Sequence, residues 1–300
     1  MLNIKDFISA LNKRRKNTSA FVTRRRHEEV VNKYTVLKNA ITSSPNPLTQ
    51  PAKLTWIKPH VHHANELCIF VSFAKQPVIK SYVALHIQAF IDQGIDVLLV
   101  INTDHPELAL NGLDQIPDVS AVCIRENIGF DFGAWSQMMR DIDTTPLHRL
   151  FWVNDSLFGP LNAASFHQMI ASVRSSDADL LGLTENGTDD KHLQSFFYAF
   201  NHRMIHDDKF LAYVRNLWQL PTKSLVIEFY ETRFTHFVHQ LGFSHEAIFS
   251  LAGKENKELT YNFPTAMYEA GFPYVKTALI RDNEDEGLAA RHLPQHLPID

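Results

Sequence analysis

Short apolar runs that alternate with amphipathic helical patterns constrain the fold of this chain more than any other feature. The runs lie at Leu67–Phe73, Ile95–Ile101, Val119–Ile124 and Leu150–Val153. Continuous apolar runs of this length are typical of parallel strands that are buried on both faces of a sheet. Because helical patterns such as Val78–Asp92 lie between them, the sequence predicts a doubly wound, Rossmann-like α/β sheet.

The remaining patterns indicate further elements and the domain boundaries. Prolines between positions 45 and 51 predict a linker. We expect a basic helical arm with its linker at 1–50, one main domain at 51–280 with helical C-terminal additions, and a flexible tail at 281–300. Further helices are expected at Trp135–Ile142, Phe166–Arg174, Asp208–Trp218, Leu225–Leu241 and Phe263–Ala270, and further strands at Leu180–Leu183, Ser195–Phe200 and Tyr274–Leu279.

The net charge of −4 hides a strong asymmetry along the 300 residues. Residues 1–40 contain ten Lys and Arg against three Asp and Glu, a net +7, so the remainder carries −11. Such an arm can lie on anionic lipid, contact nucleic acid or form a solvated helix. An acid-rich body offers nucleic acid little to hold. We therefore expect no nucleic-acid partner, and we keep peripheral contact with the inner membrane and a solvated helix as alternatives.

The cysteines and the hydropathy pattern indicate the compartment. Cys68 and Cys123 each lie inside an apolar run, so neither a disulfide scaffold nor a zinc cluster is expected. Two such thiols fit a reducing cytoplasm. No apolar stretch approaches the roughly 18–20 residues that a spanning helix needs. The sequence therefore predicts a cytoplasmic protein.

Polar residues follow the first two apolar runs at the points where the strands are expected to end. Ser72 closes the first run, and Asn102 follows the second. In an open α/β sheet these ends lie on the same edge, where a nucleobase and ribose commonly bind. The alternative is ordinary turn chemistry, which also favours Asn, Thr and Asp.

The segment after the third run contains two glycines and three polar side chains that suit a nucleotide: Gly129, Gly133, Arg125, Asn127 and Asp131. The glycines permit backbone geometries or close approaches that a Cβ forbids. The arginine can pair with a phosphate, the asparagine can bond a base or ribose, and the aspartate can accept from a sugar hydroxyl. Asp131 could instead cap the following helix. The segment matches neither G-x-G-x-x-G nor a Walker motif, so it does not support a dinucleotide or ATP site.

The fourth run ends in Asn154–Asp155–Ser156. Nucleotide-sugar transferases commonly carry two acids around this position, which bind a divalent cation that bridges the diphosphate. A single carboxylate can hold Mg²⁺ together with phosphate oxygens and water. Asp155 is thus the candidate ligand for Mg²⁺ or Mn²⁺, and metal-independent action with cationic side chains is the alternative. We expect Asp131 and Asp155 to meet at one sheet edge.

Several of these segments, read together, resemble one protein family. They are Arg125-Glu-Asn-Ile-Gly-Phe-Asp-Phe-Gly-Ala-Trp135, Asn154-Asp-Ser-Leu-Phe-Gly-Pro-Leu161, Gly182-Leu-Thr-Glu-Asn186 and His192-Leu-Gln-Ser195. In this order the chain is similar to the rhamnan synthesis protein F family over roughly residues 66–280. The resemblance implies an A-type glycosyltransferase fold and a nucleotide-sugar donor such as dTDP-rhamnose. It also implies a growing polysaccharide, lipopolysaccharide O-chain or lipid-linked glycan as acceptor.

The catalytic candidates follow from that resemblance. An inverting transfer needs a carboxylate that deprotonates the acceptor hydroxyl. In inverting A-type enzymes this acid opens a helix that ends about 11 residues later in Gly, the spacing of Glu231 and Gly242. Glu228 lies one turn earlier and could share a face with Glu231, and Glu185 is the rival base.

Three more residues are candidates for binding the nucleotide sugar or the acceptor: His192, Gln194 and Lys276. The two residues at 192 and 194 could instead have a turn role, and the lysine could be a surface strand residue. The competing function is a non-catalytic glycan- or nucleotide-binding subunit of a polysaccharide assembly complex, which the missing second acid favours.

Overall fold

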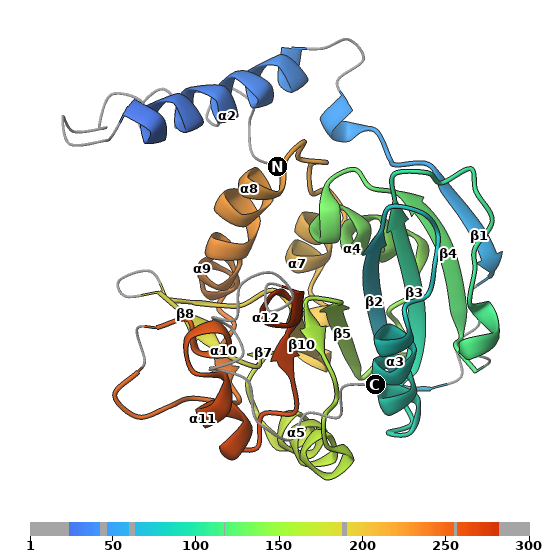
Figure 1. Ribbon diagram of the computed structural model, residues 1–300, viewed down its shortest axis with the longest axis vertical. Helices are drawn as coiled ribbons and strands as arrows, with labels where there is room; N and C mark the ends of the chain where they lie inside the picture. The colour runs from blue at the N-terminus through green and yellow to red at the C-terminus, as the bar shows by residue number, and fades with distance from the viewer. Residues whose placement is uncertain are drawn as a thin grey trace.

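The computed structural model describes residues 24–42, 47–59, 64–116, 118–187, 191–254 and 257–281. At its centre lies an eight-stranded sheet with the order β1-β4-β3-β2-β5-β10-β7-β11 (Figure 1). The strands are β1 Leu54–Lys58, β2 Glu66–Ala74, β3 Asp96–Thr103, β4 Ala121–Glu126, β5 Arg149–Asn154, β7 Leu180–Gly182, β10 Phe197–Asn201 and β11 His245–Ala247. Two small sheets pair β6 Leu157–Phe158 with β12 Val275–Lys276, and β8 Glu185–Asn186 with β9 His192–Leu193.

The helices connect these strands and cover the sheet. The longer ones are α2 Arg24–Thr42, α3 Ser81–Ile91, α4 Phe130–Asp141, α5 Ala163–Ser175, α7 Asp208–Val214 and α9 Thr232–Gln240. The shorter ones are α6 His202–Ile205, α8 Lys223–Val226, α10 Leu259–Asn262, α11 Pro264–Glu269 and α12 Thr277–Arg281. A π-helical turn, Ile227–Glu231, joins α8 to α9, and 3₁₀ turns lie at Pro47–Thr49 and Leu113–Gln115.

Strands β4, β3, β2 and β5 run parallel and correspond to the four apolar runs of the sequence. Strand β10 runs antiparallel between β5 and β7, and β1 runs antiparallel at the β4 edge. The sheet is therefore mixed but mostly parallel. This confirms the predicted α/β class with a Rossmann-like parallel centre.

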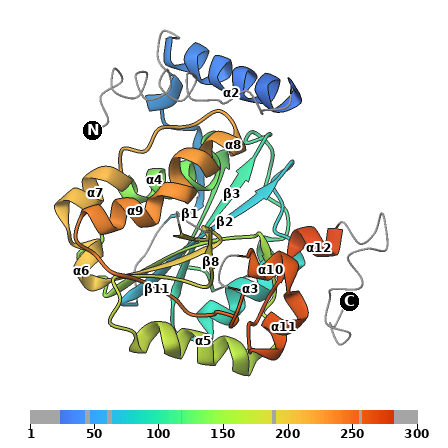
Figure 2. The same ribbon diagram turned by 90° about the vertical axis from the view of Figure 1, so that its left-hand side faces the viewer.

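The sheet separates two hydrophobic cores, because successive side chains of a strand point to opposite faces. On one face, Trp152 packs with Trp135 of α4 and Phe234 of α9. On the other face, Phe151 packs with Phe90 of α3, which in turn contacts Phe166 of α5. The molecule is thus a three-layer α/β/α arrangement (Figure 2).

Three predicted boundaries are wrong, and one strand was not predicted. Strand β1 lies between the predicted linker and the first apolar run, and α4 begins at Phe130 rather than Trp135. Helix α7 ends at Val214, four residues before Trp218. At the C-terminal end, Tyr274–Leu279 is not one strand, because only Val275–Lys276 pairs with β6 and the chain then turns into α12.

The predicted basic arm is described only in part, as α2. Its Leu37 side chain is fully buried in the core that contains α4 and α9, and α2 lies above α8 in both views (Figures 1 and 2). The predictions for residues 1–23, for His60–His63 and for residues 282–300 lie outside the described residues. Within the described ranges, no helix combines the length and the apolar character needed to span a membrane.

Candidate functional site

Asp155 is held where the carboxyl ends of β2 and β5 meet. One of its carboxylate oxygens, Oδ2, accepts hydrogen bonds from Ser72 Oγ at 2.7 Å and from the Phe73 backbone N–H at 3.1 Å. The Lys80 ammonium lies 2.6 Å from the same oxygen and forms an ion pair with it. Parallel pairing of β2 with β5 brings these strand ends together, as the sequence predicts.

Asp131 lies beside Asp155, in the first turn of α4. Its Oδ2 accepts a 2.9 Å hydrogen bond from Asn154 Nδ2. Burial, together with the charge of Asp155, raises the pKa of Asp131 to about 6, although Lys223 and the Asn154 hydrogen bond oppose this change. The predicted meeting of the two carboxylates is therefore confirmed. The alternative role of Asp131 as a helix cap is wrong, because Gly129 occupies the cap position.

Arg125 was predicted to pair with a phosphate, but its guanidinium is buried and already hydrogen-bonded within the protein. Its side chain is fully buried. Its five N–H groups donate to Gln137 Oε1, Asn102 Oδ1, Gln219 Oε1 and two carbonyls of the following loop, at 2.7–3.1 Å. Since a guanidinium has five donors, none is left for a ligand in this arrangement. Arg125 and Asn102 therefore act here as the support of the glycine-bearing loop.

Gln219 explains both glycines of that loop. A Cβ on Gly129 would lie 2.3 Å from Gln219 Oε1, and a Cβ on Gly133 would lie 2.4 Å from the same atom. Gly129 also has a φ of +73°, and Phe130 follows with a φ of +54°. Positive φ at a bulky residue is unusual and concentrates at functional sites. The close approach predicted for these glycines is confirmed, and Asn127, whose N–H bonds the Thr103 carbonyl, is half-buried next to them.

Glu231 reaches the same region from the helical side of the molecule. It ends the π-helical turn, and its Oε2 accepts a 2.5 Å hydrogen bond from Ser195 Oγ. The Glu231 charge also contributes to the raised pKa of Asp131, so the two carboxylates lie within electrostatic range. π turns inside helices are frequent at functional sites.

The helix that carries Glu231 ends as predicted. Gly242, with a φ of +84°, follows the C-cap. The Phe243 N–H bonds the Val238 carbonyl and the Gly242 N–H bonds the His239 carbonyl, which is a Schellman motif. Glu231 is the N-cap residue of α9, as the prediction has it, although α8 and the π turn continue the helical segment back to Lys223.

The other two catalytic candidates have different surroundings. Glu228 does not share the face of Glu231, since its carboxylate contacts Lys33 Nζ at 2.6 Å and the Tyr34 hydroxyl at 3.2 Å, both on α2. The π turn causes this divergence, because its i→i+5 bonding removes the three-residue register. Glu185, on β8, contacts His245 Nε2 at 2.6 Å.

His192 is the first residue of β9, and Gln194 directly follows this strand. Gln194 is buried and bonds Thr184 Oγ1 at 2.6 Å and Glu258 Oε1 at 3.0 Å. His192 is also buried, at 8% exposure. These partners give Gln194 a structural role in fixing Glu258.

The β6–β12 pair places Lys276 beside the short segment that follows Asp155. Lys276 stands opposite Leu157, and the next residue, Thr277, donates from its N–H and its hydroxyl to the Ser156 carbonyl at 2.9 and 3.0 Å. Its ammonium lies 4.5 Å from the centre of the Phe196 ring.

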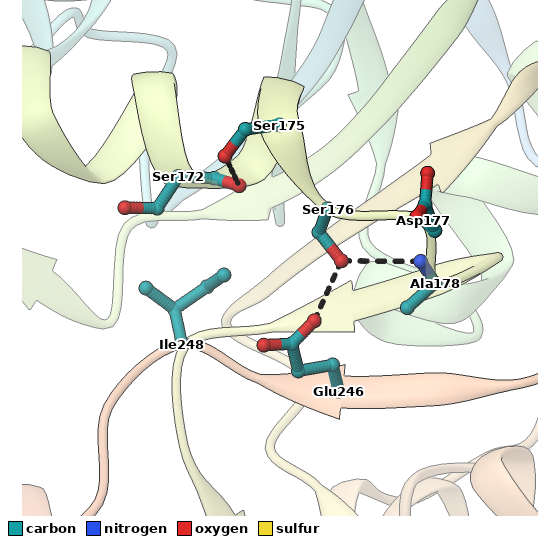
Figure 3. Close-up of a pocket in the computed structure, with 7 residues that line it drawn as sticks. All are labelled: Ser172, Ser175, Ser176, Asp177, Ala178, Glu246 and Ile248. Atoms are coloured by element: carbon teal, nitrogen blue, oxygen red, sulfur yellow. Dashed lines mark hydrogen bonds between the residues drawn. The ribbon is translucent and has the colours of Figure 1, made fainter.

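Two surface hollows lie outside this group of carboxylates. One, of about 550 Å³, is lined by Ser176, Glu246 and Ile248 near the start of β7, at the opposite edge of the sheet (Figure 3). The other, of about 310 Å³, lies beside the glycine-bearing loop and is lined by Glu126, Ile128 and Gln219 among others. Asp131, Asp155 and Glu231 do not line the second hollow.

Sequence patterns did not reveal four residues that shape the site: Lys80, Gln219, Lys223 and Glu258. Each reaches the site from a distant part of the chain, so no local motif marks it. The one available signal was that Lys80 lies shortly after the first strand end, where a basic residue can face a carboxylate from the next strand.

The fold and the grouped side chains define an α/β protein whose candidate site lies at the carboxyl edge of a mostly parallel sheet, where such proteins bind ligands. Residues 97–296 match the family described as rhamnan synthesis protein F, and the chain belongs to this family. The family points to a role in the synthesis of rhamnan or a related polysaccharide.

Two relatives show how far the similarity extends. The uncharacterized protein y4gN of Sinorhizobium fredii is 26% identical over 191 residues, which cover 62% of this chain and 49% of that protein. The virulence protein VirA of Vibrio anguillarum is 23% identical over 194 residues, which cover 53% of this chain and 62% of that protein. The matched part of the chain thus spans between about half and two thirds of these relatives.

Proposed function

We propose that the protein is an inverting glycosyltransferase that moves a sugar, rhamnose in the first instance, from a nucleoside diphosphate donor to a growing polysaccharide or lipid-linked glycan. The observation that carries this proposal is the grouping of Asp131, which Asn154 joins to the neighbouring Asp155 at the carboxyl edge of the sheet, with Glu231 within electrostatic range. The order of the parallel strands, with antiparallel β10 between β5 and β7, supports an A-type glycosyltransferase sheet.

The proposed reaction assigns one role to each side of the group. Glu231 takes the proton of the acceptor hydroxyl while that oxygen attacks the anomeric carbon. The bond from this carbon to the diphosphate breaks, and its electron pair leaves with the nucleoside diphosphate. Asn127 and the backbone around Gly129 contact the nucleoside, and Asp131 accepts from a sugar or ribose hydroxyl. Ser195 orients the Glu231 carboxylate for the proton transfer.

Replacement of Glu231 tests this assignment. In Glu231→Gln the amide cannot accept the proton, so transfer should fall by about 10²- to 10⁴-fold, whereas nucleotide affinity should stay within about twofold because the side chain does not contact the nucleoside. The measurements are sugar transfer from dTDP-rhamnose and calorimetry with dTDP.

Glu228→Gln is the matched control, since Glu228 lies on the same π turn and contacts α2. It should keep most of the turnover. Normal transfer by Glu231→Gln would reject the base assignment. Wild-type protein that binds no nucleotide would reject the glycosyltransferase in favour of a non-catalytic subunit.

A further inference from the structure

The side chains around Asp155 do not fit a divalent metal ion. The Lys80 ammonium already lies on Asp155 Oδ2, and this oxygen also accepts from Ser72 and Phe73. The other strand-end residue is Asn154, whose amide NH₂ faces Asp131. In the part of the chain that the structure describes, no group of three or more His, Cys, Asp or Glu side chains is placed to hold a metal.

Lysines surround these carboxylates instead. Lys276 pairs across the β6–β12 sheet with Leu157, which follows Asp155 by two residues in the sequence. Lys223 is the first residue of α8, the helix that leads to Glu231. The charge of Lys223 acts on both Asp131 and Lys276. Cations from β12 and from α8 therefore face the same acidic group from two directions.

The Lys276 ammonium has no close anionic partner. Among the described residues, no carboxylate pairs with it, and its contact is with the face of the Phe196 ring. Burial lowers the pKa of Lys276, while the charges of Glu258 and Glu231 oppose this change and Lys223 adds to it. One oxygen of Glu258, Oε2, is buried and accepts no hydrogen bond within the described ranges. A desolvated ammonium without an anion next to it is suited to receive one.

We propose that the protein neutralises the diphosphate of its donor with lysine side chains, Lys276 foremost and Lys223 beside it, and that donor binding needs no divalent metal. This proposal rests on the glycosyltransferase function above. The lysines meet the same need as a metal ion, since the diphosphate gains charge as the anomeric bond breaks. Lys80 keeps Asp155 neutralised, so that the carboxylate does not repel the phosphates.

Calorimetry on the full chain tests the metal requirement. The nucleoside diphosphates dTDP, UDP and GDP are titrated in EDTA, and then again with Mg²⁺ or Mn²⁺. For the nucleotide that binds, we expect affinities that agree within about twofold between the two conditions. Binding that appears only with the metal would overturn the lysine proposal and leave the glycosyltransferase function standing. If none of the three binds under either condition, both proposals fall.

Substitution of Lys276 tests the residue. Loss of one charge-assisted contact should weaken diphosphate binding by about 10- to 100-fold in Lys276→Met, and Lys276→Arg should restore part of the affinity. The loss should be much smaller for the monophosphate of the same nucleoside, because it lacks the second phosphate. A merely structural defect would weaken the binding of both ligands. Lys209→Met is the control and should bind as wild type, because Lys209 is an exposed residue of α7.

The arginine variant also guards against misfolding, because it keeps the charge and the stem if Lys276→Met fails to fold. Wild-type diphosphate affinity in folded Lys276→Met would overturn the assignment. Equal losses for the diphosphate and the monophosphate would do the same.

Discussion

Asp131 and Asp155 are neighbours, but their charges are compensated differently. Asp155 has an ion pair with Lys80 and two further donors. Among the described residues, the neutral Asn154 amide, at 2.9 Å, is the one group that hydrogen-bonds the Asp131 carboxylate. A carboxylate that is buried near like charges without a counter-ion holds its proton more tightly. The ionised form of Asp131 is therefore destabilised in the native state, and a ligand hydroxyl that donates a hydrogen bond to it would stabilise it.

This difference predicts how stability depends on pH. Burial raises the pKa of Asp131 from 3.8 to about 6 in the folded protein. Between these values the folded state binds more protons than the unfolded state, so the Asp131 contribution is fully present below about pH 4 and is lost as pH rises through about 6. Two pKa units correspond to about 3 kcal/mol, which is an upper limit because the side chain is half-buried.

Asp131→Asn should remove that part of the pH dependence. We expect the variant to be more stable than the wild type near neutral pH, by about 1–3 kcal/mol, and equally stable near pH 4. The measurement is urea unfolding at several pH values between these limits. A stability difference that does not change with pH would contradict the prediction.

At the scale of elements, the helical segment from α8 to α9 connects the arm to the site. Its π turn directs Glu231 toward Ser195, and the same turn directs Glu228 toward Lys33 and Tyr34 of α2. Leu37 of α2 is fully buried, and Ala40 and Ile41 pack against the same core. Apolar burial is worth more here than the half-exposed ion pair.

Leu37→Ala should therefore loosen α2 more than Lys33→Ala does. A buried leucine truncation costs about 2–5 kcal/mol, whereas the partly exposed ion pair contributes about 0–1 kcal/mol. Hydrogen exchange of residues 24–42 should speed up strongly in Leu37→Ala and only slightly in Lys33→Ala, while strands β2, β3 and β5 stay protected. Equal exchange in the two variants would show that the ion pair, and not the apolar contact, holds α2.

The elements that the sequence predicted well are those whose signal is local. Strands β2, β3, β4 and β5 are apolar along their whole length because both of their faces are buried, so they stand out in the sequence. Strand β1, by contrast, is a five-residue edge strand with alternating exposure. Its short, mixed sequence next to a proline is also typical of a linker, and only its pairing with β4 makes it a strand.

The site, too, contains residues that local sequence patterns predicted and contacts that they did not. Asp131 and Asp155 were predictable, because parallel strand ends meet at one edge of the sheet. The Ser195–Glu231 bond and the Arg125–Gln219 bond join residues 36 and 94 positions apart. No periodicity encodes such contacts. For the same reason, the sequence suggested that Arg125 is a phosphate ligand, although three distant side chains and two nearby carbonyls accept all five of its guanidinium hydrogen bonds.

At the scale of the whole molecule, the charge of the chain is unevenly distributed. Residues 1–40 carry a net +7 and the rest −11. The described part of the arm, α2, is attached beside the helix that carries the proposed base. A lipid-linked acceptor would lie at a membrane surface, and we propose that the basic arm brings the site to that surface through anionic lipid headgroups.

Vesicle partitioning tests the proposed role of the arm. Removal of residues 1–23 deletes Lys5, Lys13, Arg14, Arg15 and Lys16 and leaves α2 in place. Because each basic residue near an anionic surface contributes about 1 kcal/mol, the shortened protein should partition onto phosphatidylserine vesicles at least about 100-fold more weakly. Added salt should weaken binding of the full chain by screening these charges, and neutral phosphatidylcholine vesicles should bind neither protein. Equal partitioning of the two proteins onto anionic vesicles would refute the membrane role, and unchanged nucleotide affinity in the shortened protein would show that the site itself is intact.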